Sequence, residues 1–346
     1  MPRYQRRGIS PWERALALPF RKVLLANLLM RPRATEWAGV LTVILAALVS
    51  PQTAGAHGIA GNRFFPGTLT FDDPAVADEA IFPNFSHLDH PGGGGNVTDN
   101  RIDYAFTRLL TPTVGIVVDN SWIARNWGVA QRFGFDTTDV GLKWEVYRDN
   151  PHETLVAASL LWGIGNTGAQ GVDARAPNTI KPGLFFGKGF GDSPDSLRWL
   201  RPFAVTGAVI LEHPSGSISN NLGFNPVSGQ LGPMLTRSVD ILHWGFAVEF
   251  STLYLTSRFT GGPPKEEPLN QLVPLIEFAV DSASGRKSIA TMNPGVSYVA
   301  VTWQLAIEAI VPLNNASGHG VGGRTQLLLF LDDLAPSLFG KPLLSR

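Results

Sequence analysis

Residues 241–251 read "ILHWGFAVEFS", and the side chains of this stretch alternate in size and polarity. Every even position carries a large apolar side chain, and from His243 onward every odd position is small, polar or charged. A period of two is typical of a β-strand whose two faces lie in different environments. Two folds accommodate such a strand: a soluble sandwich that turns the apolar face to a core, and a membrane barrel that turns it to lipid.

The same alternation recurs, with varying purity, between residues 101 and 332. With the first stretch included, eleven segments read as strands: 101–109, 113–122, 139–147, 153–164, 181–190, 201–212, 241–251, 272–281, 291–299, 303–311 and 324–332. Most are close to the roughly 9–11 residues that a tilted strand needs to cross a bilayer. The sequence contains no cysteine, which excludes disulfides and cysteine-based metal sites.

The connections between these segments alternate in length. Short connections follow residues 109, 148 and 299, whereas longer polar or glycine-rich ones follow residues 122, 164, 212 and 311. Two connections break the rule, because 253–271 is long and 282–288 is brief. Short turns at one end and long loops at the other are the layout of an outer-membrane barrel. If the short turns are periplasmic, strand 101–109 runs toward the periplasm, so we predict a twelfth, poorly patterned strand within 60–90.

Two features favour the barrel over the sandwich. Bulky aromatic side chains fall near both ends of the strands, as interfacial girdles require; the side chains predicted to face lipid are Trp122, Trp162, Trp199, Trp244 and Trp303. The opposite face carries charged and polar side chains in mid-strand, and those predicted to face the lumen are Asp103, Asp119, Asp139, Lys143, Glu145, Lys181, Glu212, His243, Glu249, Glu277 and Glu308. A sandwich would have to bury the indoles with hydrogen-bond partners and protect its edge strands. We therefore predict an all-β fold, a closed antiparallel up-and-down transmembrane β-barrel of about 12 strands.

The N-terminal residues have the order of a secretory signal peptide. Residues 1–56 combine a basic region, the apolar run 38–49 and a small-x-small site at 54–56, which predicts cleavage after Ala56; an anchoring helix is the alternative. This leader takes eight of the 28 Lys and Arg residues and two of the 28 acidic ones, so the mature chain is acidic. An acidic chain lacks the basic footprint of a nucleic-acid partner, and that class of function is excluded.

The remaining boundaries follow from these patterns. Residues 57–100 are rich in proline, glycine and acids and read as an irregular N-terminal segment that contributes one strand or a plug. Residues 101–332 form the predicted transmembrane barrel, and residues 333–346 form a C-terminal tail. We expect the exported protein in the outer membrane, where its partners are outer-membrane lipid and small-molecule solutes.

One part of the sequence resembles a known family. The stretch "GFDTTDVGLKWEVYRDNPHETLVAASLLWGIGNTGA", residues 134–169, resembles the strand–turn–strand signature of a bacterial outer-membrane family of transporters named for the meta-pathway of phenol degradation. The likeness extends loosely over 101–312. The chain departs from the common outer-membrane pattern of a terminal aromatic residue, because it runs past its last strand and ends at Arg346. The resemblance implies passage of small, including apolar, compounds and transfers no functional residue.

Two other patterns resemble a cofactor-binding motif and a catalytic pair, but their surroundings in the sequence do not support those functions. "GIGNTG" at 163–168 has the spacing of a dinucleotide fingerprint, but Gly171 and Pro177 follow where that motif requires a helix, so we predict a loop. His243 and Ser251 lie eight residues apart on one strand, roughly 27 Å, and cannot act together as base and nucleophile. We predict no enzymatic activity, catalytic residue or cofactor.

Two stretches carry side chains that can bind metal ions. His57 would become the mature N-terminus, and with His87 and His90 it could bind copper through imidazole and amine nitrogens; the alternative is a solvated loop. The acidic run at 72–79 fits no EF-hand loop, and we read it as solvated; the alternative is loose calcium binding at the membrane surface.

The inward carboxylates are the collective feature with a functional consequence. With few bases expected to face them, they give the lumen a negative potential and a preference for cationic or neutral solutes. We predict a channel or transporter-like barrel for small apolar or cationic solutes. The alternative is a non-transporting outer-membrane scaffold, or a metal-binding protein that uses the N-terminal histidine segment.

Overall fold

The computed structural model describes residues 58–344, apart from residues 62, 93–94, 129, 173, 226–229, 253–254 and 256–271. The predicted leader 1–56, its cleavage site and His57 lie outside the described residues. Within the described ranges, no helix has both the length and the apolar character that crossing a membrane requires.

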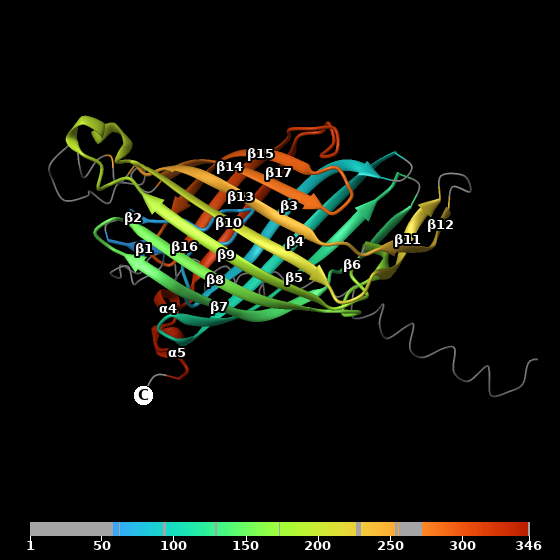
Figure 1. Ribbon diagram of the computed structural model, residues 1–346, viewed down its shortest axis with the longest axis horizontal. Coiled ribbons are helices and arrows are strands. Elements are labelled where there is room, and N and C mark those ends of the chain that lie inside the picture. The colour runs from blue at the N-terminus through green and yellow to red at the C-terminus, as the bar shows by residue number, and fades with distance from the viewer. Residues whose placement is uncertain are drawn as a thin grey trace, which may run out of the picture. The chain divides into compact units, whose positions relative to one another are not determined.

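Twelve antiparallel strands form one closed ring (Figure 1). In ring order they are β3 (Glu79–Gly92), β4 (Gly95–Thr111), β5 (Val114–Asn126), β7 (Thr138–Asp149), β8 (Thr154–Ile164), β9 (Thr179–Gly189), β10 (Phe203–Pro214), β13 (Ile241–Phe250), β14 (Leu272–Ala283), β15 (Ile289–Val299), β16 (Trp303–Pro312) and β17 (Gly322–Phe330). The last strand, β17, pairs with the first, β3, and closes the ring. The predicted closed antiparallel β-barrel of about 12 strands is confirmed.

All eleven strand-like segments of the sequence coincide with strands of this ring, and β3 is the predicted twelfth. The barrel begins at Glu79, however, rather than at residue 101. Strand β3 is poorly patterned because its pairing shifts at a bulge between Ile81 and Asn84. A bulge exchanges the two faces of a strand, so alternation before and after it runs out of phase.

Apolar side chains cover the outside of the barrel. On β9, Ile180, Leu184 and Phe186 are exposed, whereas Phe185 between the last two is buried. The exposed fraction is 58% for Leu184 and 4% for Phe185. Strands β8, β10, β13 and β16 also expose large apolar side chains at alternate positions. The bulky face of the alternating pattern therefore points away from the protein interior.

The two ends of the barrel differ. At one end lie the short connections β4–β5, β7–β8 and β15–β16, the 3-10 helix η2 (Asp195–Leu200), and the short helices α4 (Leu331–Leu334) and α5 (Pro336–Phe339). At the other end the chain forms extra strands: β6 (Gln131–Phe135), which pairs antiparallel with the last residues of β5, and the hairpin of β11 (Ile218–Asn225) and β12 (Gln230–Arg237) (Figure 1). The brief connection between β14 and β15 is also at this end.

Between residue 58 and the start of the barrel, the described residues form two very short strands, β1 (Ile59–Ala60) and β2 (Arg63–Phe64), which pair with each other. After β2 the chain has no helix or strand until β3 begins. We call residues 65–78 the luminal segment, because its side chains and backbone contact the inward side chains of the barrel strands, as described next.

Candidate functional site

The luminal segment is buried although it has no regular secondary structure. Phe65, Leu69, Ala75 and Val76 are all buried. Backbone polar groups that leave water without joining a helix or sheet need other partners. In this segment many of those partners are inward side chains of the barrel strands.

One side of the barrel binds the middle of the luminal segment. The side-chain amide of Gln304 on β16 accepts a hydrogen bond from the Gly67 N–H (3.1 Å) and donates one to the Gly67 carbonyl (2.6 Å). The Glu277 carboxylate on β14 accepts hydrogen bonds from the backbone N–H groups of Leu69 (2.7 Å) and Thr70 (3.0 Å). The two carboxylate oxygens of Glu277 thus replace the carbonyl partners that a neighbouring strand would supply to these two N–H groups.

The opposite side of the barrel binds the segment through Lys143 on β7. Its ammonium group donates hydrogen bonds to the Asp72 carboxylate (2.5 Å) and to the Asp73 carbonyl (2.7 Å), and it lies 3.7 Å from the Asp73 carboxylate. Its side chain is only 2% exposed. The same ammonium lies 5.0 Å from the centre of the Phe185 ring, a cation–π distance.

The two sets of contacts come from facing walls. The amide of Asn293 on β15 donates to the Thr70 hydroxyl (3.0 Å), and β15 lies six places from β7 in the ring of twelve. The luminal segment therefore crosses the lumen from one wall to the other at the level of these residues. Glycine admits this close approach at Gly245, where a Cβ atom would lie 2.4 Å from the ring of Phe71.

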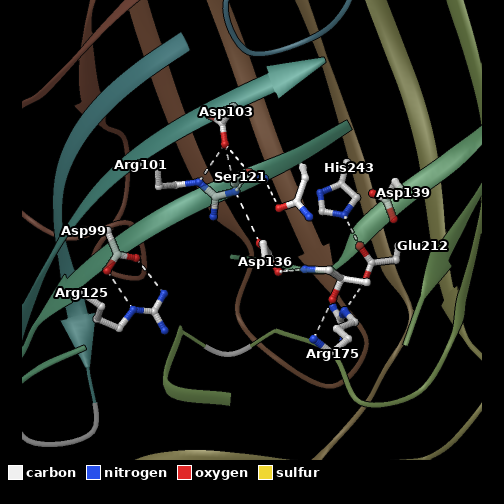
Figure 2. A network of polar contacts seen from close by, with 12 residues as sticks. Asp99, Arg101, Asp103, Ser121, Arg125, Asp136, Asp139, Arg175, Glu212 and His243 are labelled. Carbon is white, nitrogen blue, oxygen red and sulfur yellow. Dashed lines mark hydrogen bonds and ion pairs between the residues drawn. The ribbon is translucent and has the colours of Figure 1, made fainter. Parts of the chain in front are cut away.

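A cavity of about 210 Å³ remains between the luminal segment and the walls formed by β17, β3, β4, β5 and β7–β10. Asp119 and Lys143, two of the predicted lumen-facing residues, line it. Toward the end with the extra strands, charged side chains form the network drawn in Figure 2.

The first part of this network joins a loop and five strands, β7, β9, β10, β13 and β14. Lys181 on β9 pairs with Asp139 (2.5 Å) on β7 and with Glu212 (3.4 Å) on β10. Arg175 also pairs with Glu212 (Figure 2). Arg175 belongs to the connection between β8 and β9, whose 3-10 helix η1 (Gln170–Val172) packs against β6 and β11. This connection therefore brings a basic side chain to the inward carboxylates.

His243 on β13 belongs to the same part of the network. Its Nδ1 atom lies 2.6 Å from the Asp281 carboxylate, and its Nε2 atom lies 3.6 Å from the Glu212 carboxylate. Ser251 directly follows the opposite end of β13. The length of the strand therefore separates it from His243, and the two cannot act together as nucleophile and base.

The second part of the network lies on β4 and β5. The Arg101 guanidinium donates to the hydroxyl of Ser121 (2.7 Å) and lies 3.2 Å from the Asp103 carboxylate. The Arg125 guanidinium binds both oxygens of Asp99 at 2.8 and 2.7 Å, a bidentate arrangement (Figure 2).

These pairs correct the expectation that few bases face the inward carboxylates. The predicted carboxylates that pair with basic side chains are Asp103 with Arg101, Asp139 with Lys181, Glu145 with Arg148, Glu212 with Arg175, and Glu308 with Arg324. The sequence held signals for this. Lys143 and Lys181 are themselves predicted to face the lumen, and Arg101 lies two residues before Asp103, so these two residues share a strand face. Arg175 gave none, because it lies in a loop.

The other predicted site residues are also located. Glu249 is buried and accepts a hydrogen bond from the Thr206 hydroxyl (2.7 Å). Among the tryptophans predicted to face lipid, Trp162, Trp199 and Trp244 are exposed; Trp199 lies in η2 rather than in a strand. Trp122 and Trp303 are half-buried, with ring centres 6.3 Å from Phe133 and 5.5 Å from Tyr298 respectively.

Two of the three histidines of the copper hypothesis, His87 and His90, are described, and they are not brought together. His87 Nδ1 lies 2.8 Å from the Asn100 amide oxygen, and His90 Nε2 lies 3.2 Å from the Asp99 carboxylate. Three residues apart on one strand, they lie on opposite faces.

The two remaining motifs also have clear locations. In the acidic run, Asp72, Asp73 and Glu79 have carboxylate oxygens within 4.8 Å of one another. Lys143 pairs with both aspartates of this group. The "GIGNTG" motif runs from the end of β8 into a turn, and the three-residue helix η1 follows it.

The ring of strands and these contacts define a class: a twelve-stranded β-barrel whose lumen is crossed by the chain's own N-terminal segment. No family model matches the chain, and no curated protein matches it. The resemblance to the family named for phenol degradation therefore stays a prediction.

Solved structures of barrels resemble the chain at low sequence identity. The KdgM porin in complex with disordered oligogalacturonate is 10% identical, with a TM-score of 0.40, over 72% of this chain and 98% of the porin. An outer-membrane channel from Pseudomonas putida F1 is 10% identical, with a TM-score of 0.48, over 73% of this chain and 95% of that channel. The translocator domain of the autotransporter NalP from Neisseria meningitidis is 8% identical, with a TM-score of 0.39, over 73% of this chain and 88% of the domain.

Proposed function

We propose that this protein is an outer-membrane channel for small solutes and that its luminal segment closes the channel at rest. The observation that carries the proposal is the path of residues 65–78, which cross the lumen while bonded to facing walls. Their contacts to the walls use side chains such as Glu277 and Lys143 rather than a strand ladder. Such contacts can be broken while the hydrogen bonds between the barrel strands stay intact.

The outward face supports insertion in a membrane. Exposed apolar side chains at alternate positions of many strands are costly in water but suited to acyl chains. A closed barrel also satisfies every strand backbone internally, which a bilayer demands. We propose that Trp162, Trp199 and Trp244 contact lipid, and that the short turns and the C-terminal tail face the periplasm after removal of the leader.

Opening is then a population shift between a bound and a released luminal segment. Release separates Lys143 from Asp72 and Asp73, and Glu277 from the backbone of Leu69 and Thr70. Because the lumen wall carries paired charges and polar side chains, water and small polar or cationic solutes can occupy the space that the segment leaves.

A reversible cross-link tests the proposal, because the natural sequence contains no cysteine. In the double variant Thr70→Cys with Asn293→Cys, oxidation should join the luminal segment to β15, where the two native side chains lie 3.0 Å apart. We expect solute flux into proteoliposomes to be lower for the oxidised protein and to recover on reduction. Each single cysteine variant is the matched control and should not respond to oxidant.

The alternative is a scaffold that transports nothing, and the same crossing of the lumen by residues 65–78 favours it. Flux at the level of protein-free liposomes, in both the oxidised and the reduced double variant, would support the scaffold and refute the channel. Heat-dependent gel mobility checks that each sample holds a folded barrel.

A further inference from the structure

The cavity beside the luminal segment has the size of a small-molecule site. Its volume is about 210 Å³. An engineered protein cavity of roughly 150 Å³ is enough to hold benzene. The space therefore fits one ring with a short substituent, or an aliphatic molecule of similar size.

We propose that this cavity binds a small organic cation, an ammonium group on a short apolar body. The inference rests on the proposed channel function only for access, because the ligand reaches the cavity along the lumen. Binding itself depends on the three properties of the cavity wall described below.

The first property is an apolar side. Leu161, Phe185 and Ile210 from β8, β9 and β10 line the cavity together with Phe71 of the luminal segment. These side chains remove the apolar body of a ligand from water, and the two phenylalanine rings can also face a cation.

The second property is a set of buried acceptors that lack partners. Asn84 on β3 and Gln326 on β17 are paired directly across the two strands, and their side chains are 7% and 2% exposed. The Asn84 amide is oriented by its Nδ2, which donates to the Leu69 carbonyl (3.0 Å). Among the described residues, Asn84 Oδ1 and Gln326 Oε1 have no hydrogen-bond partner. Buried acceptors without donors are costly, so they favour a ligand that brings N–H groups.

The third property is an excess of negative charge. The carboxylates of Asp72, Glu79 and Asp119 line the cavity, and Lys143 is the only basic side chain among the lining residues. Lys143 is already bound to Asp72 and Asp73. Lys143 also interacts electrostatically with Glu79. A cationic ligand would therefore chiefly meet Asp119, whereas an anion would be repelled.

Three ring compounds of similar size separate the possible outcomes: benzylammonium, toluene and benzoate. Binding to the full chain in detergent micelles can be measured by calorimetry. We expect benzylammonium to bind at least about tenfold more tightly than either of the others, a difference of about 1.4 kcal/mol. Toluene or benzoate binding as tightly as benzylammonium, or no binding by any of the three, would overturn the proposal.

A variant locates the site. Asp119→Asn keeps the shape of the side chain and should weaken benzylammonium about tenfold or more while leaving toluene unchanged. Asp103→Asn is the matched control, because Asp103 also lies on the inward face but pairs with Arg101 outside the cavity. Equal affinity of the wild type and the Asp119 variant would assign the cation to another place and refute this site.

The outcomes for this site and for the channel are distinguishable. Calorimetry in micelles needs no conduction, so benzylammonium binding with background flux in liposomes would keep the site and refute the channel. If the Asp119 variant fails to show heat-dependent mobility, the comparison of the three compounds on the wild-type protein still decides the proposal.

Discussion

Replacing Lys143 by methionine should release the luminal segment. Methionine preserves the length of the side chain but removes the ammonium that binds Asp72 and the Asp73 carbonyl. In the variant, the bound segment would hold both carboxylates next to an apolar side chain. The released segment would return these groups to water, so the balance between the bound and released states shifts toward release.

The size of the shift follows from burial. Removing one partner of a fully buried ion pair costs about 3–5 kcal/mol. The Asp72 side chain is 33% exposed, so solvent screens this ion pair, and the cost of removing Lys143 falls to roughly 1.5–3 kcal/mol. Because 1.4 kcal/mol is a factor of ten, the released population should rise about 10- to 100-fold.

Channel recordings in planar bilayers measure this population as the open fraction of time. The matched control is Lys181→Met, which removes another inward lysine whose ion pairs are with Asp139 and Glu212 on the barrel wall. We expect the open fraction to rise in the Lys143 variant and to stay near the wild-type value in the Lys181 variant. An unchanged open fraction for Lys143→Met, or an equal rise in both variants, would refute the assignment of Lys143 as the residue that holds the segment.

Three further predictions use other parts of the molecule. Glu277→Gln keeps one acceptor oxygen but loses the second one, so one of the two backbone N–H groups loses its partner. We expect the luminal segment to bind the wall with about 1–2 kcal/mol less free energy and to be cleaved faster by protease; an unchanged cleavage rate contradicts this. Leu184→Lys places a charge on the proposed lipid face and should destabilise the barrel in vesicles by about 2–4 kcal/mol, whereas Leu235→Lys on β12, 71% exposed beyond the ring, should not. The carboxylates around the cavity predict a cation preference, so reversal potentials in a salt gradient should favour cations, and an anion preference would count against it.

Most of the barrel could be predicted from the sequence because alternation is a local property. Each of the eleven segments alternates between bulky apolar and small or polar side chains, and this alternation can be read without knowing which strands lie beside it. Counting connections then added a twelfth strand, which is β3. Its start at Glu79 was missed because the bulge after Ile81 breaks the alternation, and bulges depend on pairing with β4 and β17.

The candidate site was only partly predictable. The inward positions of Lys143, Glu277 and Asp119 followed from parity along their strands. Their partners did not, because Lys143 lies 70 residues from Asp73 in sequence and Glu277 lies 208 residues from Leu69. Likewise, Arg175 enters the charged network from a loop, where no periodicity indicates the direction of a side chain.

The sequence by itself determined that this chain alternates between two unlike faces, and hence that it forms an all-β fold of about twelve strands. The tertiary structure decided what fills the interior. In the opening stretch, Gly245 reads simply as a small residue on the polar face, but after closure it is the place where the Phe71 ring meets the wall. Period-two alternation records which face a side chain takes, whereas ring closure and strand register decide which distant segments meet inside.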